Sequence, residues 1–405
     1  MSTGIGVTAG DTRRDVVHRQ RMDHSLDAFR GRLLIQCRSA AVVSILDIAE
    51  QTGAGLVLTG ASPENTVRRL RDRGFNGPIL CDADRYSGRR RISAGRGTHP
   101  AWIRRQRDLG LIPLTDSGYL APRNWTGLKA ILQAASREPT PTVAVLPMST
   151  RWFATAAICA ALSREINRYG VPVALVLEHE ADPFGRQYLL KGLLQLLAAS
   201  TAPVLLLRSD VSAIGALCHG AHAAAVGTIG ALRHLYPVTA RGPRRPIGLS
   251  AFVTRLLSYH RLETCEEIFA DTPDIAHLWT CDCPVCGGVP PDRLGATDNP
   301  GVAAARHSLY CVLELHAELF RGLRTRDQLV SAWHETCSHA LYIHDQVAET
   351  ADRWRKPANL RTWNAITEDP LPYRDRIPGQ PAEHGPRVTP SHRREAPAPP
   401  RGSGR

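Results

Sequence analysis

Residues 171–180 read VPVALVLEHE, in which seven apolar residues precede two acids and a histidine. The apolar residues follow one another without the alternation of a half-buried strand. A continuous run of this kind is typical of a strand buried on both faces, as in a parallel sheet covered by helices. The stretch therefore predicts an α/β fold, with acidic side chains placed where the strand ends.

Similar apolar runs recur along the first half of the chain, and segments with helical patterns separate them. Eight strand–helix units are the repeat number of a (βα)8 TIM barrel, which we predict for residues 31–250. A doubly wound open sheet is the alternative, because the pattern does not show closure. The runs occupy residues 32–38, 55–60, 78–84, 110–118, 142–149, 171–180, 202–210 and 221–228.

The strand–helix alternation stops after residue 228. We expect residues 251–350 to form a helical subdomain, with helical patterns at 249–269 and 302–349. Residues 1–30 are expected to be a flexible basic segment. Residues 351–405 are rich in Pro and Arg and are expected to be a tail, disordered from about residue 370.

The composition favours a polyanionic partner. Lys and Arg number 50 against 38 Asp and Glu, which gives a net charge of +12 and a pI near 9.5. Such a balance is typical of proteins that bind nucleic acid, although Arg-rich tails account for about half of the excess. The sequence leaves open whether the chain forms homo- or hetero-oligomers.

The N-terminal sequence has no apolar core of a secretory signal, and the apolar runs are shorter than the ~20 residues of a membrane span. We therefore expect a cytoplasmic protein without a membrane partner. In a reducing compartment the ten cysteines are expected to be buried thiols or metal ligands rather than disulfides.

A second stretch, WTCDCPVCGG at 279–288, places three cysteines in a C-x-C-x-x-C spacing. Pro284 and the two glycines supply the sharp turns that convergence on one ion requires. Structural Zn²⁺ takes four Cys or His ligands in a tetrahedron. We predict Cys281, Cys283, Cys286 and His307 as these ligands, with Cys311 and His316 as rivals for the fourth position.

This arrangement resembles the zinc site of the tRNA-guanine transglycosylase family, in which C-x-C-x-x-C precedes a histidine that opens a helix. CDCPVC and RHSLYCVLELHAEL carry the resemblance, which extends over about residues 30–350. The resemblance implies a (βα)8 barrel, a structural Zn²⁺, and exchange of guanine for a 7-deazaguanine base in tRNA or DNA. The reaction is a retaining displacement at C1′ through a carboxylate-linked sugar, so it needs a nucleophile and a second acid.

Acids at the carboxyl ends of the predicted strands are the catalytic candidates. TDSGY at 115–119 resembles the family segment D-S-G-G-[FY]-Q, which implies Asp116 as the proton-handling residue and Gly118 and Tyr119 as substrate-binding residues. The second Gly and the Gln are missing. The family's nucleophile follows the last strand, but this chain has no Asp or Glu between Asp210 and Glu263. We therefore assign the nucleophile to Asp82, paired with Asp116, and keep Asp210 in reserve.

Arginines after the last predicted strand, Arg244 and Arg245 above all, are expected to bind phosphates. Because the usual nucleophile is missing, a second interpretation remains: a non-catalytic, zinc-stabilised subunit that binds nucleic acid or assembles with a catalytic chain. A barrel hydrolase with an unrelated zinc insertion is a third and weaker hypothesis.

Overall fold

The computed structural model of the chain describes residues 26–238, 248–271, 273–323, 325–351 and 354–366. All of them belong to one compact unit of the chain. Most of the predicted N-terminal segment, Arg244, Arg245 and the tail beyond residue 366 lie outside the described residues.

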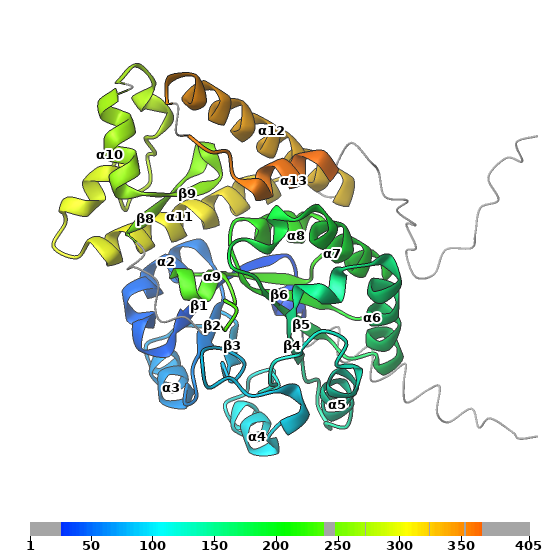
Figure 1. Cartoon of the computed structure of the whole chain (residues 1–405). Coiled ribbons are helices and arrows are strands. Elements are labelled where there is room, and N and C mark those ends of the chain that lie inside the picture. The colour runs from blue at the N-terminus through cyan, green and yellow to red at the C-terminus, as the bar shows by residue number, and fades with distance from the viewer. Residues whose placement is uncertain (1–25, 239–247, 272, 324, 352–353, 367–405) are drawn as a thin grey trace, which may run out of the picture. The chain divides into compact units, whose positions relative to one another are not determined.

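Seven parallel strands form a curled sheet in the order β3-β2-β1-β7-β6-β5-β4 (Figure 1). Strand β1 lies between β2 and β7, so the first and last of the seven strands along the chain are neighbours, as in a barrel. These strands coincide with seven of the eight predicted runs. They are β1 Arg32–Arg38, β2 Leu56–Thr59, β3 Ile79–Asp82, β4 Ala144–Ser149, β5 Val173–Glu178, β6 Val204–Ser209 and β7 Ala223–Gly227.

The inner face of the curled sheet is one continuous apolar core. Both edge strands of the sheet contribute to this core, β3 with Leu80 and β4 with Val145. Burial of alternate side chains inside, with the others under the outer helices, explains why the runs are apolar without interruption. Other members of this core are Leu34, Val57, Leu114, Val176, Leu205, Leu207 and Ala225.

The predicted strand at 110–118 is not a regular strand, which corrects the eight-strand barrel. Residues of this segment make only isolated parallel bridges, Leu114 to Val143 and, just beyond, Leu120 to Met148. On its other side Tyr119 bridges Ser93 in the loop after β3, rather than β3 itself. Within the described residues the sheet is therefore curled but not closed. The loop after β3, rather than β3 itself, pairs with the segment that would complete the barrel.

Helices cover the outer face of the sheet, and α3 to α8 surround the strands in Figure 1. No helix of the described residues has both the length and the apolar character of a membrane span. The helices of this part are α2 Leu46–Thr52, α3 Glu64–Asp72, α4 Pro100–Asp108, α5 Trp125–Ser136, α6 Ala156–Tyr169, α7 Gln187–Ala199, α8 Ser212–Cys218 and α9 Gly230–Arg233.

The part after residue 248 begins with an antiparallel pair, β8 and β9, so the helical prediction for 249–269 is wrong in its first half. Leu257 turns the chain with a φ of +46°, and the rings of Phe252 and Tyr259 pack across the pair at 5.3 Å. Helices follow the pair. The elements are β8 Ser250–Val253, β9 Ser258–Arg261, α10 Leu262–Asp271, α11 Pro300–Phe320, α12 Arg326–Thr350 and α13 Ala358–Ile366.

Helices α12 and α13 pack against α8, where Gly215 leaves room for the rings of Trp333 and Trp363. Asn359 of α13 donates a hydrogen bond to half-buried Asp182. Helix α13 falls within the range assigned to the tail, and its apolar face explains why that part of the range is helical and packed.

Candidate functional site

The C-x-C-x-x-C loop and the amino-terminal half of α11 bring one histidine and several thiols together. The ligand atoms of Cys281, Cys283, His307 and Cys311 all lie within 4.8 Å of one another. His307 and Cys311 are four residues apart on α11, so both face the loop. These four residues could hold a metal ion.

The distances within this group fit a tetrahedral site. A metal–sulfur bond of about 2.3 Å implies a separation of about 3.8 Å between two thiolates on one ion. Cys281 Sγ lies 3.8 Å from Cys311 Sγ and 3.7 Å from His307 Nδ1, and Cys283 Sγ lies 3.4 Å from His307 Nδ1. Cys311, predicted as a rival, thus occupies the position that the spacing assigned to Cys286.

Cys286 remains close to the cluster, 3.1 Å from Cys281 Sγ and 3.3 Å from Cys283 Sγ. Both distances are shorter than the edge of a metal–thiolate tetrahedron. Burial raises the pKa of the Cys286 thiol to about 12, whereas contact with Cys281 holds the pKa of Cys283 well below its usual range. His316, the other rival, hydrogen-bonds the carbonyl of Gly31 at 2.9 Å instead.

The opposite ring nitrogen of His307 fixes its tautomer. Nε2 lies 3.0 Å from the carbonyl oxygen of Phe252 on β8, an acceptor only, so Nε2 carries the proton. Nδ1 is then the lone-pair nitrogen that faces the thiols. A backbone carbonyl that orients a ligating histidine in this way is a usual feature of metal sites.

At the carboxyl end of the sheet, Asp82 is the centre of a buried hydrogen-bond network. Its Oδ2 accepts from Tyr86 Oη at 2.6 Å and from Gln36 Nε2 at 3.0 Å. The Asp82 side chain is 2 % exposed, and Arg208 Nε lies 3.8 Å away. Burial raises the pKa of Asp82, and the guanidinium of Arg208 opposes that rise. Asp84 extends the network by pairing with Arg208 and Arg38.

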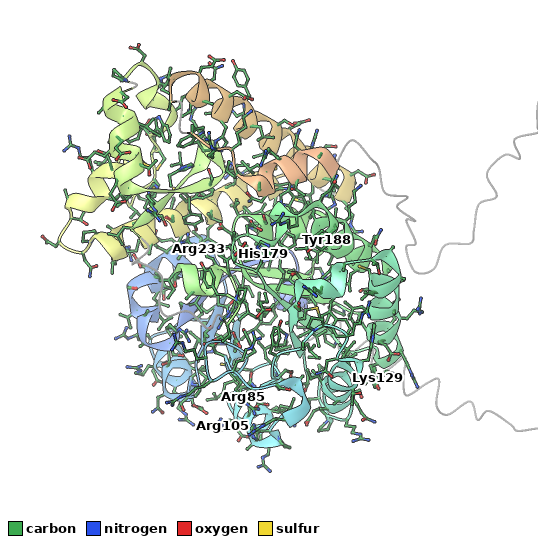
Figure 2. All side chains as sticks on the ribbon, viewed as in Figure 1. Arg85, Arg105, Lys129, His179, Tyr188 and Arg233 are labelled. Carbon is green, nitrogen blue, oxygen red and sulfur yellow. The ribbon has the colours of Figure 1, made fainter. Side chains whose placement is uncertain are left out.

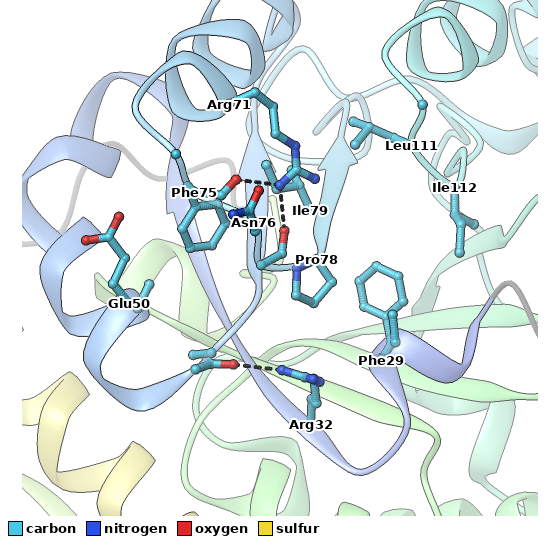
Figure 3. Close-up of a pocket in the computed structure, with 17 residues that line it drawn as sticks. Phe29, Arg32, Glu50, Arg71, Phe75, Asn76, Pro78, Ile79, Leu111 and Ile112 are labelled. Atoms are coloured by element: carbon cyan, nitrogen blue, oxygen red, sulfur yellow. Dashed lines mark hydrogen bonds between the residues drawn. The ribbon is translucent and has the colours of Figure 1, made fainter.

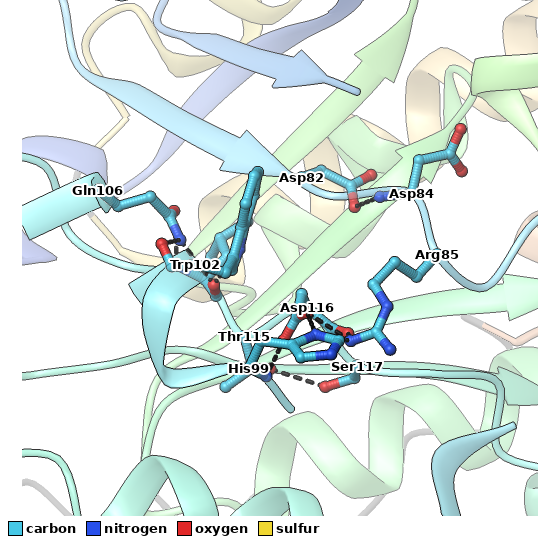
Figure 4. Close-up of polar contacts among 10 residues, drawn as sticks. Asp82, Asp84, Arg85, His99, Trp102, Gln106, Thr115, Asp116 and Ser117 are labelled. Carbon is cyan, nitrogen blue, oxygen red and sulfur yellow. Dashed lines mark hydrogen bonds and ion pairs between the residues drawn. The ribbon is translucent and has the colours of Figure 1, made fainter. Parts of the chain in front are cut away.

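Asp116 lies in a different network, between the loop after β3 and the start of α4 (Figure 4). Its Oδ1 accepts from the backbone N–H of His99 at 2.8 Å, and its Oδ2 lies 2.6 Å from His99 Nδ1 and pairs with Arg85. Within the described residues Asp82 and Asp116 share no partner. The predicted pairing of these two aspartates is therefore not a direct contact.

His99 is a candidate that the sequence interpretation missed. Its side chain is 63 % exposed while that of Asp116 is 3 % exposed. Its Nδ1 lies within hydrogen-bond distance of both Asp116 Oδ2, at 2.6 Å, and Arg85 Nη1, at 2.7 Å, and the residue lines a cavity of about 430 Å³. Arg85, Trp102 and Arg105 line the same cavity, and Figure 2 labels Arg85 and, on α4, Arg105. The signal in the sequence was His99-Pro100 directly after a basic loop.

Gly118 and Tyr119 serve packing around this loop. A Cβ on Gly118 would lie 2.5 Å from the backbone of Ser93, so the close approach that needs glycine is to the loop after β3. The Tyr119 hydroxyl donates to Glu178, and Arg91 lies 3.7 Å above its ring. Burial raises the pKa of Tyr119 to about 12.

Asp210, the reserve nucleophile, belongs to neither network. Its Oδ1 accepts from the N–H of Val211 at 2.6 Å, and its Oδ2 lies 3.9 Å from His234 Nε2. Burial lowers the pKa of His234 to about 4, so this histidine is neutral near pH 7. The structure thus places the three predicted catalytic aspartates in three separate environments.

No family model matches the chain, and no curated protein matches it. Among solved structures, it is similar to the carboxyl transferase domain of Rhizobium etli pyruvate carboxylase with 3-bromopyruvate, at 13 % identity and a TM-score of 0.34, over 56 % of this chain and 45 % of that one. A variant of Rhizobium etli pyruvate carboxylase with acetyl coenzyme-A matches at 14 % identity and a TM-score of 0.34, over 89 % of this chain and 36 % of that one. The chain spans less than half the length of either structure.

Proposed function

We propose that this chain exchanges a guanine base for a 7-deazaguanine in tRNA or DNA, on a curled, barrel-like parallel sheet stabilised by a zinc subdomain. The observation that carries the proposal is the His99–Asp116 pair on the wall of the 430 Å³ cavity. A buried carboxylate that orients an exposed imidazole is an arrangement suited to general acid–base work. The reaction needs such a group, because a proton must reach the departing base and leave the arriving one.

The displacement also needs a carboxylate that attacks C1′ and is later displaced by the incoming base. We assign this step to Asp82. Burial raises the pKa of Asp82, and the guanidinium of Arg208 and the hydrogen bond from Tyr86 oppose that rise by favouring the ionised form, which is the nucleophilic one. Because Asp82 is 1 % exposed, the loop after β3 must move aside when a nucleoside binds.

The loop after β3 also supplies the positive charge for a nucleic-acid backbone. Residues 85–96 contain five arginines. Arg85 and Arg91 pair with acids, whereas Arg89, Arg90 and Arg96 are exposed. Exposed arginines beside a catalytic cavity are suited to bind phosphates. We therefore assign the phosphate contacts to this loop, in addition to Arg244 and Arg245 of the initial prediction.

We assign Zn²⁺ to the Cys281, Cys283, His307 and Cys311 cluster, because three thiolates and an imidazole in a tetrahedron are a standard structural zinc set. Four protein ligands leave no position for substrate. The ion would hold the C-x-C-x-x-C loop to α11 and take no part in the displacement.

Incorporation of labelled guanine into tRNA and DNA tests the enzyme proposal. His99→Gln is expected to slow exchange by about 100-fold or more, since general acid–base groups contribute about 10²–10⁴-fold, and Asp116→Asn, which removes the carboxylate that orients the imidazole, by a smaller factor. Asp82→Asn is expected to abolish exchange and any denaturation-resistant adduct. Asp108→Asn, an exposed acid at the end of α4, is the matched control. Full activity of the Asp116 and Asp82 variants would refute the assignment.

A second function, a non-catalytic nucleic-acid-binding subunit, is favoured by a specific observation. The named strand-end acids Asp82, Asp116 and Glu178 are all held by arginines within the chain. Under this alternative, wild-type protein binds tRNA or DNA but neither exchanges guanine nor forms an adduct. Binding in both cases should weaken with salt, and Arg89→Glu with Arg90→Glu should flatten that dependence, whereas Arg164→Glu on α6 should not.

A further inference from the structure

The Cys/His cluster contains one thiol more than a four-coordinate ion binds. Three thiols and one imidazole already make up the set of Cys281, Cys283, His307 and Cys311. Cys286 is a further donor in the same loop, outside that set. A thiol that touches metal ligands without being one is able to react with them. This surplus thiol is therefore a feature that a purely structural metal site does not explain.

Cys286 contacts two of the ligand thiols directly. Its Sγ lies 3.1 Å from Sγ of Cys281 and 3.3 Å from Sγ of Cys283. Because a disulfide bond is about 2.05 Å long, a bond between Cys286 and Cys281 needs a shift of roughly 1 Å between the two sulfur atoms. The backbone N–H of Gly287 donates to the carbonyl oxygen of Cys283 at 2.8 Å, and this turn keeps Cys286 beside both thiols.

The thiols of the cluster differ in their access to solvent. Cys281 is partly exposed, whereas Cys283, Cys286 and Cys311 are buried. A small oxidant therefore reaches Cys281 first. As a metal ligand, Cys281 is a thiolate, which is the form that reacts with peroxides. Cys281 thus combines the exposure and the ionisation state that oxidation requires, and the surplus thiol is in contact with it.

The polar groups of a larger concavity, by contrast, do not converge. A cavity of about 650 Å³ lies at the amino ends of β1, β2 and β3. Figure 3 shows its two arginines, Arg32 and Arg71, on opposite sides of Pro78. Arg32 donates to the carbonyl oxygen of Gly53 at 2.8 Å, and Arg71 donates to that of Phe75 at 2.6 Å. The convergence of reactive groups therefore favours the Cys/His cluster as a place for further chemistry.

We propose that Cys286 is the resolving thiol of a redox-sensitive metal site that opens on reaction with hydrogen peroxide. The inference rests on the metal assignment made above. The Cys281 thiolate attacks one peroxide oxygen, the O–O bond breaks, and the products are a sulfenic acid and hydroxide. The Cys286 thiol then attacks the sulfenic sulfur, and the S–S bond forms while the hydroxyl group leaves with the thiol proton as water.

The two sulfur atoms together lose two electrons, which reduce the peroxide to water and hydroxide. With Cys281 in the bridge, the site keeps only Cys283, His307 and Cys311 as ligands. Its affinity for the ion falls, because a structural site depends on four protein ligands. Release of the ion then frees the C-x-C-x-x-C loop from α11.

Treatment of the full chain, purified with its zinc, with hydrogen peroxide tests the proposal. We expect zinc release, measured with a colorimetric chelator, together with a bridge between Cys281 and Cys286. An endoproteinase that cleaves before aspartate cuts at Asp282 and separates Cys281 from Cys283 and Cys286. The expected bridge therefore appears in mass spectrometry as linked peptides, whereas a bridge between Cys283 and Cys286 stays within one peptide. Dithiothreitol with added Zn²⁺ should restore the metal content.

Cys286→Ser removes the resolving thiol but no assigned ligand. This variant should retain zinc, form no linked peptides, and release zinc about tenfold or more slowly under peroxide. Cys265→Ser, which changes a buried thiol of α10 in the same part of the chain, is the matched control. It should leave both the bridge and the rate of release unchanged.

The zinc content before oxidation separates this inference from the metal assignment. Protein without zinc at the start would refute the metal assignment and the inference that rests on it. Zinc that is present and retained after oxidation would overturn the redox inference alone. Equal release rates from wild-type protein and the Cys286→Ser variant, or a bridge that excludes Cys286, would do the same.

Discussion

The Cys/His cluster and the carboxyl-end acids differ in how their charges are compensated within the chain. In the cluster, three thiols and an imidazole nitrogen converge, and none of the four residues is a Lys or Arg that would balance them as thiolates. At the carboxyl end, Asp82, Asp84 and Asp116 already have arginine partners. A site whose groups need an external cation indicates its ligand, whereas a site balanced internally can be structural or catalytic.

The largest expected effect concerns the cluster. Cys283→Ser should remove the bound metal and lower the melting temperature by about 10 °C or more, because structural zinc contributes about 10 kcal/mol or more to the folding of small domains. Metal analysis of purified protein and thermal melting measure both. Cys159→Ser changes a buried thiol of α6 and should leave the metal content unchanged. Wild-type protein without bound metal would show that the cluster is a set of core thiols and not a metal site.

The next prediction concerns which cysteine, Cys311 or Cys286, completes the metal site. We expect Cys311→Ser to lose metal nearly as completely as Cys283→Ser, and Cys286→Ser to retain it, because only Cys311 lies at tetrahedral distances from Cys281 and His307. Metal content of the two variants decides between them. Loss of metal in the Cys286 variant alone would restore the set predicted from the spacing.

At the carboxyl end, Arg208→Met should destabilise the fold by about 3–5 kcal/mol, because it leaves Asp82 and Asp84 buried without their shared cation. Chemical denaturation measures the change in the free energy of unfolding. Arg38→Gln removes a 43 % exposed partner of Asp84 and should cost less than about 1 kcal/mol. Equal effects of the two substitutions would show that the network is solvated and open to substrate.

A smaller effect for each residue is the pH dependence of the core beside the cluster. His260 stacks on Trp354 at 4.5 Å, and burial lowers the pKa of His260 to about 3 and that of His344 to about 4. Both imidazoles are neutral in the folded chain. The free energy of unfolding is therefore highest above pH 6.5, where the unfolded chain does not protonate them either. It declines as the pH falls toward these folded-state values, because only the unfolded chain takes up protons. At pH 5 we expect a loss of about 2 kcal/mol per histidine.

Urea unfolding at pH 7.5 and pH 5.0, with zinc content measured in parallel, checks this expectation. His260→Gln should reduce the pH dependence, whereas His339→Gln, at an exposed position of α12, should not. An unchanged pH dependence in the His260 variant, with zinc retained at pH 5.0, would contradict it.

The sequence by itself predicted what depends on local patterns. Uninterrupted apolar runs marked the seven strands, because both faces of each strand are buried. Three cysteines within six residues and His307 at the helix predicted the convergence of ligands, since a tight loop and one helix face fix most of that geometry. The β8–β9 pair was missed because the turn at Leu257 lies within an apolar pattern that also suits a helix.

Only the tertiary structure decided which residues meet across long separations in the chain. Cys311 rather than Cys286 fits the tetrahedron because α11 packs against the loop with a particular rotation. Asp82 and Asp116 both follow apolar runs, but Arg208 from β6 approaches one and His99 the other. The run at 110–118 does not form a regular strand, because the loop after β3 lies beside it and Ser93 of that loop pairs with Tyr119. Local composition predicts which segments are buried, but the partner of each polar group depends on packing between distant segments, which no single run encodes.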